Sequence, residues 1–234
     1  MNQFDKIITE RQFDEERALY HLQNSRVSKC NFAGPADGES VLKEARNIAV
    51  EKCSFSLRYP LWHVKSFSLA DSAMDELTRA AIWYADDGEI TGSRLHGIKA
   101  VRECGHIRLI DCDIDSQEFG WKCTEITMKD CTVNSEYLFF DSKNVTLSDI
   151  KMTGKYSFQY MENLVIENCT MEETDLAFEY SDVEADIIGN VMSVKNPRSG
   201  RIILDSVDEV IMEDAAMECS GEVIVRIGGQ RCSR

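Results

Sequence analysis

The nine cysteines of this sequence are the residues with the most obvious capacity for chemistry. Four of them form two pairs with the same spacing, Cys104 with Cys123 and Cys112 with Cys131. Such pairs could form disulfides or bind zinc, but no CxxC motif is present and nine thiols cannot all pair. Because the cysteines interrupt alternating apolar segments, such as NLVIENCTM at 163–171, we expect buried thiols that pack in a core. The sequence therefore indicates no metal site and no cofactor.

A row of five aspartates and one asparagine stands directly before these cysteines or before the residues that replace them. Its members are Asp71, Asp111, Asp130, Asp149, Asn168 and Asp214. Carboxylates stacked about 5 Å apart repel one another, so a stripe of bound calcium is one interpretation. The other is that each residue accepts a backbone N–H in the turn after its strand. The second is favoured, since cation sites need converging ligands rather than a straight row.

Three carboxylates are candidates for acid–base catalysis. Asp86 and Asp87 precede LHGIK, which contains His96 and Lys99, and Glu179 lies beside an aromatic residue further along the chain. Two-residue matches of this kind arise by chance in a chain that is 29% charged. Whether the protein is an enzyme therefore stays open.

Aromatic residues suggest a binding surface more strongly than the carboxylates suggest catalysis. The candidate ligand-binding residues are Tyr59, Trp62, His63, Trp83, Tyr84, Trp121 and Tyr180, together with Lys195, Asn196 and Arg201 from the basic segment SVKNPRSGR. If the rings point outward, they can stack on the apolar faces of sugar rings; if they point inward, they belong to the core. Adjacent residues such as Trp62 and His63 cannot both face the interior of a regular strand.

The elements that carry these residues are defined by an internal repeat. Taking the cysteine as an anchor, apolar residues recur five and three positions before it and two after it, as in Ile126, Met128, Cys131 and Val133. Ten anchors follow one another at nearly regular intervals from Cys30 to Ala215. The interval is too short for two helices, and the alternation within each unit is typical of strands.

The repeat predicts an all-β fold, a right-handed, single-stranded parallel β-helix of about ten coils with a period of about 19 residues. A leucine-rich-repeat horseshoe shares the core pattern, but it would need a helical segment in each unit. We expect an N-terminal cap and first strand at 1–26, the β-helix at 27–228 and a C-terminal tail at 229–234. The cap is expected in residues 10–22, where Asp14, Glu15 and Glu16 favour a helix.

The charge and hydropathy of the chain limit the kinds of partner that it can bind. Forty-one acidic residues against 26 basic ones give a formal net charge of −15, which disfavours nucleic acid and anionic membrane surfaces. No run of 18 apolar residues and no signal-like segment occur, so a cytoplasmic location is expected. The remaining partners are a saccharide ligand and further copies of the same chain.

Segments outside the repeat resemble a known bacterial family. They are ERALYHL (16–22), DGESVLKEARNIAVEKCSF (37–55), RYPLW (58–62), AAIWY (80–84), LAFEYSDVEADI (176–187) and SVKNPRSGRI (193–202). Together they resemble the domain-of-unknown-function family numbered 3737. The resemblance implies a pectin-lyase-like right-handed β-helix and implies no activity.

Three functions remain in view. The first is a carbohydrate-binding module that presents an aromatic and polar face. The second is a polysaccharide-active hydrolase or lyase, which needs two carboxylates in one cleft. The third is a structural or protein-interaction scaffold without catalytic activity.

Overall fold

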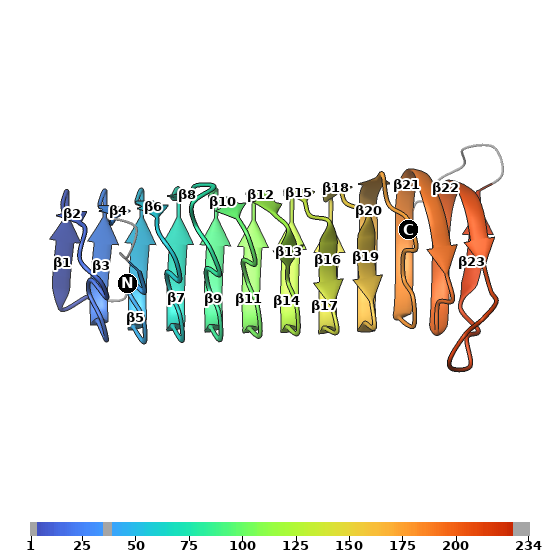
Figure 1. Cartoon of the computed structure of the whole chain (residues 1–234), viewed down its shortest axis with the longest axis horizontal. Coiled ribbons are helices and arrows are strands. Elements are labelled where there is room, and N and C mark those ends of the chain that lie inside the picture. The colour runs from blue at the N-terminus through green and yellow to red at the C-terminus, as the bar shows by residue number, and fades with distance from the viewer. Residues whose placement is uncertain (1–3, 35–38, 227–234) are drawn as a thin grey trace.

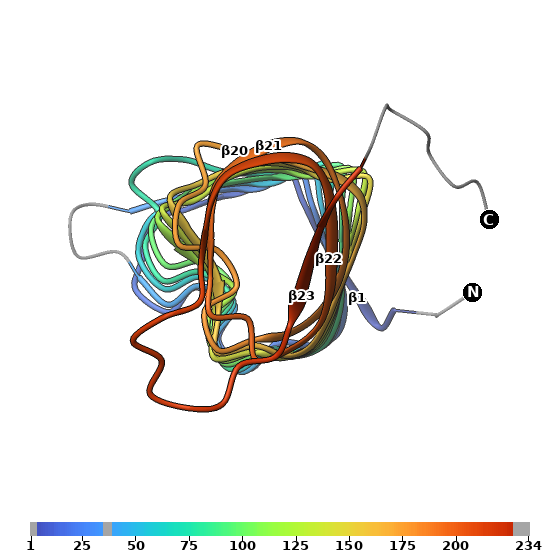
Figure 2. The ribbon, with the colours of Figure 1, turned by 90° about the vertical axis from the view of Figure 1, so that its right-hand side faces the viewer.

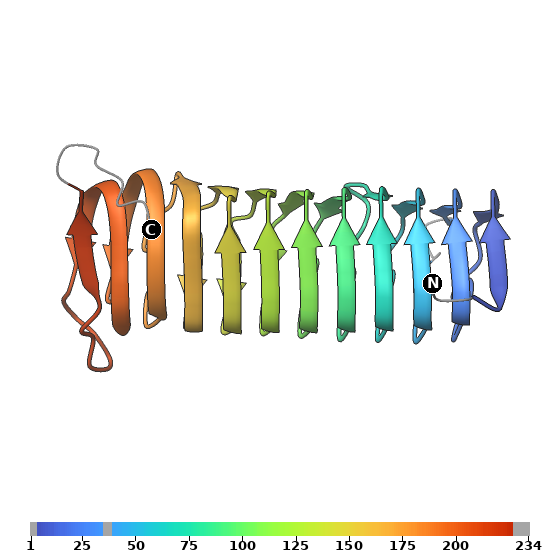
Figure 3. The same cartoon turned by 180° about the vertical axis from the view of Figure 1, so that it is seen from behind.

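The computed structural model describes residues 4–34 and 39–226, and these form one elongated stack of coils (Figures 1 and 3). Every pairing between its strands is parallel, and equivalent residues of successive coils lie in register, as with Ile107, Ile126 and Val145. The described residues contain no helix. The fold is therefore an all-β parallel solenoid with a period of about 19 residues, as the repeat predicted, and it has about 11 turns where about ten coils were expected.

Each coil contributes strands to two long sides of the solenoid and, in the middle coils, to a third. The first side contains β1 (Lys6–Thr9), β3 (Gln23–Ser28), β5 (Arg46–Glu51), β7 (Lys65–Ala70), β9 (Asp86–Thr91), β11 (Gly105–Ile110), β14 (Thr124–Lys129), β17 (Lys143–Ser148) and β23 (Glu222–Val225). The second contains β2 (Gln12–Phe13), β4 (Asn31–Ala33), β6 (Ser54–Ser56), β8 (Ala73–Met74), β10 (Arg94–Gly97), β12 (Asp113–Ser116), β15 (Thr132–Asn134) and β18 (Lys151–Thr153). Three long strands run through both sides, namely β20 (Glu162–Glu172), β21 (Asp182–Lys195) and β22 (Ser199–Ile211). The third side contains β13 (Glu118–Phe119), β16 (Tyr137–Phe140) and β19 (Tyr156–Gln159).

The core runs along the axis of the solenoid. Viewed along that axis, the coils overlay in a roughly four-sided outline (Figure 2). Inward residues of the first side form fully buried columns, for example Leu109, Met128, Leu147 and Ile166. Phenylalanines add stacked rows, with Phe32 and Phe55 at a centroid distance of 5.0 Å. Residues at the same position of the repeat thus pack on one another in successive coils, as the repeat predicted.

The anchor cysteines hydrogen-bond the backbone at the corner between the first two sides. The thiol of Cys169 accepts the N–H of Ile150 at 3.4 Å, and the thiol of Cys53 accepts that of Cys30 at the same distance. Ser72 takes the same place for the N–H of Cys53. Burial raises the pKa of Cys53 and of Cys169 to about 11, so both remain neutral thiols. Cysteine and serine in this column therefore pack in the core and also satisfy a buried amide, whereas Ile150 only packs in the core.

The row of five aspartates and one asparagine before the anchors marks a left-handed turn position. Asp71, Asp111, Asp130 and Asn168 all have a φ between 47° and 55°, and Gly92 occupies the same position with a φ of 54°. Aspartate, asparagine and glycine tolerate this region best among the amino acids. This backbone conformation accounts for the residue types in the row. Residues 4–34 and 39–226 contain no group of three or more His, Cys, Asp or Glu side chains that could hold a metal ion.

The N-terminal segment differs from the expected helical cap. Residues 10–22 contain strand and turns, and strands β1 and β2 already pair with β3 and β4. The first coil therefore begins at residue 6 rather than at residue 27. Helix propensity is overridden because Phe13 continues the phenylalanine row, 5.1 Å from Phe32.

The expected tail at 229–234 lies outside the described residues, and so does Cys232. In the part of the chain that the structure describes, no helix is long and apolar enough to cross a membrane.

Candidate functional site

An aromatic row follows the solenoid axis where the third side turns into the first. Its successive members are Trp62, Trp83, Arg102, Trp121, Phe140, Tyr160 and Tyr180. Trp62 and Trp83 stack with a centroid distance of 5.3 Å and an interplanar angle of 5°. The Arg102 guanidinium lies between Trp83 and Trp121, 5.1 and 5.3 Å from their ring centroids. The structure thus connects Trp62, Trp83, Trp121 and Tyr180, which the sequence placed in one candidate site.

The tryptophans are held in place by hydrogen bonds to the next coil. The indole N–H of Trp62 donates to the carbonyl of Ala80, that of Trp83 to Lys99 at 2.6 Å, and that of Trp121 to Tyr137 at 3.2 Å. All three rings are half-buried. Trp83 lies between Trp62 and the Arg102 guanidinium, and the Lys43 ammonium lies over the Trp62 ring, 5.9 Å from its centroid.

Tyr59, His63 and Tyr84 surround the first two tryptophans. Tyr59 lies 4.8 Å from Trp62, and the exposed His63 stacks on Tyr84 at 4.8 Å. Tyr84 meets Trp62 and Trp83 edge-on, at 6.0 Å from each. Five of the expected ligand-binding residues therefore form one cluster on two adjacent coils.

The C-terminal part of the row contains the most accessible ring of the row. Tyr160 is 42% exposed and lies 5.4 Å from both Phe140 and Tyr180, inclined to them by 64° and 45°. Tyr180 is buried, with 7% of its surface exposed, and its hydroxyl accepts the N–H of Ala216. That contact comes from the loop between β22 and β23, which projects from the coil outline (Figure 2).

The basic segment does not act as one unit. Lys195 forms an ion pair with Glu179 at 2.9 Å, which raises the pKa of the lysine, and Glu179 accepts the backbone N–H of Tyr160 at its carbonyl. Asn196 is completely buried and donates to the carbonyl of Glu213, so its side chain supports the backbone and is not accessible to a ligand. Arg201 lies on β22 in the first side, near Glu184 at 3.6 Å.

The three candidate catalytic carboxylates do not share a site. Asp86 forms a hydrogen bond with His106 at 2.9 Å, which raises the pKa of the histidine, and Asp87 accepts the hydroxyl of Ser66 at 2.8 Å. Both aspartates begin β9, whereas Glu179 lies five coils further along, at about 4.8 Å per coil. Glu179 therefore cannot act together with Asp86 or Asp87 on one glycosidic bond.

The histidine and lysine of LHGIK have other partners. His96 lies 3.2 Å from Asp113, and Lys99 pairs with Glu118 at 3.4 Å. Neither is among the groups that pair with Asp86 or Asp87. A cavity of about 420 Å³ does include Asp87 and His106, beside Ser66 and Arg108.

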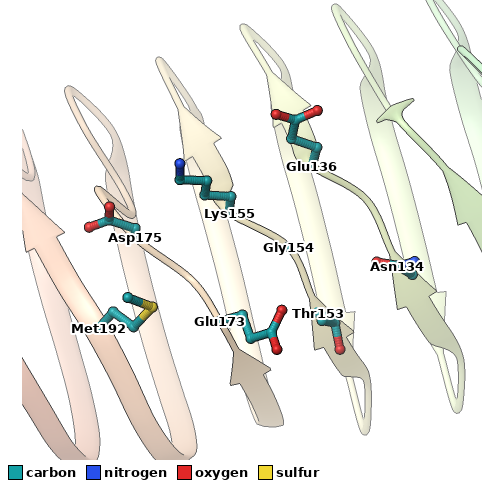
Figure 4. A pocket seen from close by; sticks show the side chains of 8 residues that line it. All are labelled: Asn134, Glu136, Thr153, Gly154, Lys155, Glu173, Asp175 and Met192. Carbon is teal, nitrogen blue, oxygen red and sulfur yellow. The ribbon is translucent and has the colours of Figure 1, made fainter.

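A second cavity, of about 450 Å³, opens where β15, β18 and β20 end (Figure 4). Lys155 lies between Glu136 and Asp175 of the neighbouring coils, and Glu173 and Met192 line the other side (Figure 4). Gly154 allows the coil to turn closely here, since a Cβ atom would lie 2.0 Å from the carbonyl oxygen of Ser135.

Sequence reasoning missed several residues of the aromatic surface. Tyr137 and Tyr156 stack at 5.2 Å on the third side, and Tyr137 also touches Trp121. Lys155 lies over the ring of Tyr156 at 5.0 Å. One repeat period separates Tyr137 from Tyr156, and Arg102 from Trp121, and this spacing was the signal that could have identified them.

These features define a parallel β-solenoid with a row of aromatic side chains in mutual contact, interrupted by Arg102. The chain belongs to the family described as "Protein of unknown function (DUF3737)", which matches residues 6–166 and 159–225. No curated protein matches the chain. Among solved structures, it is weakly similar to QnrB1, a plasmid-mediated fluoroquinolone resistance protein, with 9% identity, a TM-score of 0.24, and coverage of 76% of this chain and 89% of that one.

Proposed function

We propose that this protein is a saccharide-binding β-solenoid whose ligand stacks on Tyr160. The observation that carries the proposal is the 42% exposure of Tyr160 within an aromatic row whose other members are half-buried or buried. Neither neighbour covers it face to face, because Phe140 and Tyr180 are inclined to it by 64° and 45°. A sugar ring combines an apolar face with a rim of hydroxyl groups, and an exposed ring beside fixed polar groups matches that combination.

The ion pair between Glu179 and Lys195 suits hydroxyl groups, and the carbonyl of Glu179 accepts the backbone N–H of Tyr160. The Glu179 carboxylate and the Lys195 ammonium are 2.9 Å apart and keep 16% and 28% of their side-chain surface exposed. One accepts and the other donates hydrogen bonds, and their charges balance. The formal net charge of −15 acts against polyanionic ligands, so the proposal specifies a neutral saccharide.

Binding is favoured over hydrolysis by the distribution of the carboxylates. Hydrolysis needs two carboxyl groups that flank one glycosidic bond. Glu179, the carboxylate closest to the proposed site among the three candidates, pairs with Lys195, and Asp86 and Asp87 lie five coils away. The tryptophan part of the row then serves to hold the surface rigid.

The test is a titration of the protein with a panel of neutral oligosaccharides, measured by calorimetry and by tryptophan fluorescence. Tyr160→Ala is expected to weaken binding by about tenfold or more, since a central aromatic contact is lost. Tyr20→Ala is the matched control, because Tyr20 is 48% exposed but lies in the first coil. Equal binding by wild type and Tyr160→Ala, or no binding to any member of the panel, would contradict the proposal.

A further inference from the structure

The C-terminal end of the solenoid leaves inward-facing side chains uncovered. Leu204 is completely buried, but Val225, its partner on the last strand, is 47% exposed. Likewise Val194 is completely buried, whereas Val210, its partner in the next coil, is 43% exposed. Within residues 4–34 and 39–226, the columns that form the core elsewhere therefore end here in exposed side chains.

Large exposed apolar side chains concentrate at the same end. Among the residues that the structure describes, most of them come from its last three coils, namely Met192, Val210, Met212, Met217, Ile224 and Val225. Exposed apolar side chains that gather in one region of a protein are typical of an interaction site.

The last strand also has an unpaired edge. Within residues 4–34 and 39–226, β23 pairs with β22 and with no other strand (Figures 1 and 3). The N–H and C=O groups on its other edge can accept a further strand. A partner must therefore supply both a strand and an apolar end that continues the core.

We propose that the partner is a second copy of this chain, bound end to end through antiparallel pairing of the two β23 strands. The residues at 222–226, EVIVR, are self-complementary in the register centred on Ile224. That register pairs all five residues and places Val223 opposite Val225, so inward residues meet inward residues, as the two-residue period of a strand requires. Ile224 then faces its own copy on the outer surface.

A single two-fold axis provides both a strand for the free edge of β23 and an apolar end that continues the core. An axis through Ile224, perpendicular to the sheet, joins the two first sides into one continuous sheet and keeps both interiors on the same side. The half-buried Val223 and the exposed Val225 of one chain then continue the apolar columns of the other. Such an interface is isologous and closes as a dimer.

Charge is compatible with this register. Glu222 lies opposite Arg226 of the second copy, so no like-charged residues of the two strands face each other. The Arg226 side chain is 11% exposed, and its guanidinium is already held by Asp186 and by Asp205. These contacts anchor the last strand to the preceding coils, which presents a rigid edge to the partner.

The N-terminal end does not offer the same surface. The inward residues of its first coil, Ile8, Phe13 and Ala18, are only 3%, 6% and 2% exposed. The Arg11 guanidinium lies over the Phe13 ring, 5.3 Å from its centroid. Pairing of the C-terminal end with this covered end would moreover generate open filaments rather than a closed dimer.

The test measures molar mass by light scattering and sedimentation over a wide range of protein concentration. The wild type is expected to form a dimer and no larger species. Ile224→Lys and Ile224→Glu should each yield folded monomers, because each places two like charges opposite one another at the two-fold axis. An equimolar mixture of the two variants should dimerise again, which a general loss of folding could not produce. Leu77→Lys is the control, since Leu77 is 71% exposed away from this end and its substitution should leave the dimer intact.

Each alternative result overturns the proposal. A wild type that is monomeric at every concentration excludes the dimer. A mass that rises without a plateau indicates head-to-tail filaments. A dimer that persists in both Ile224 variants, or a mixture that remains monomeric, excludes the pairing of β23 about Ile224.

Discussion

The two ends of this solenoid differ in how completely the apolar side chains of their terminal coils are covered. At the N-terminal end, Arg11 covers the ring of Phe13, and the inward residues of the first coil are 6% exposed or less. At the C-terminal end, Val210 and Val225 continue buried columns but are 43% and 47% exposed. Solenoid coils are stabilised chiefly by their neighbours, so a terminal coil needs a cap or a partner. At the N-terminal end the phenylalanine row lies under Arg11 and the aliphatic Ile8 is buried as well, whereas at the C-terminal end two aliphatic columns stay open.

The largest expected effect is a loss of stability when a carboxylate replaces a buried valine, compared with the same substitution at an exposed valine of the same column. Val194 and Val210 are paired in adjacent coils, but the first is completely buried and the second is 43% exposed. Val194→Asp should lower the free energy of unfolding by about 4 kcal/mol or more, because it buries an unpaired carboxylate. Val210→Asp should cost less than about 1 kcal/mol.

Chemical unfolding of both variants measures this difference. Each should be made in the Ile224→Lys background, so that self-association does not contribute to the free energy. Similar losses in the two variants would show that the C-terminal coil is as well covered as the interior ones.

The next effect concerns the corner at which cysteine and serine anchors accept a backbone N–H. Cys169→Val removes the acceptor of the Ile150 N–H and should lower the free energy of unfolding by about 1–3 kcal/mol, since the amide is left buried without a partner. Cys169→Ser should cost less, because Ser72 performs the same role for Cys53. Thermal unfolding followed by circular dichroism compares the two; a serine variant less stable than the valine variant would refute the hydrogen-bonding role.

Much of the fold was predictable because each coil repeats the same local solution. The repeat placed Cys112 next to Cys131 and Ile126 next to Val145, and the structure confirms this register. The first coil was mistaken for a cap because Asp14, Glu15 and Glu16 favour helices, and a local signal cannot reveal that the Phe13 ring stacks on the next coil.

The candidate site was harder to predict because the third side is not a regular strand. Tyr59, Leu61 and His63 all have positive φ, so the simple alternation of inward and outward residues fails there, and Trp62 and His63 both keep access to solvent. Tyr180 illustrates a different limit. It is buried by the loop that contains Ala216, which lies far along the chain, and no local pattern indicates that contact.

The smallest expected effect is at the covered end. Arg11→Ala removes the cation from the Phe13 ring and should lower the free energy of unfolding by about 0.5–2 kcal/mol, through lost cation–π attraction and lost cover of the ring. Arg17→Ala is the matched control, because Arg17 lies in the same coil, is 58% exposed and pairs with the neighbouring Glu16. Hydrogen exchange should then show faster opening of β1 and β2 in the Arg11 variant alone. If both variants exchange at the wild-type rate, the first coil is covered by something other than Arg11, and the difference between the two ends lies in their backbone pairing rather than in this side chain.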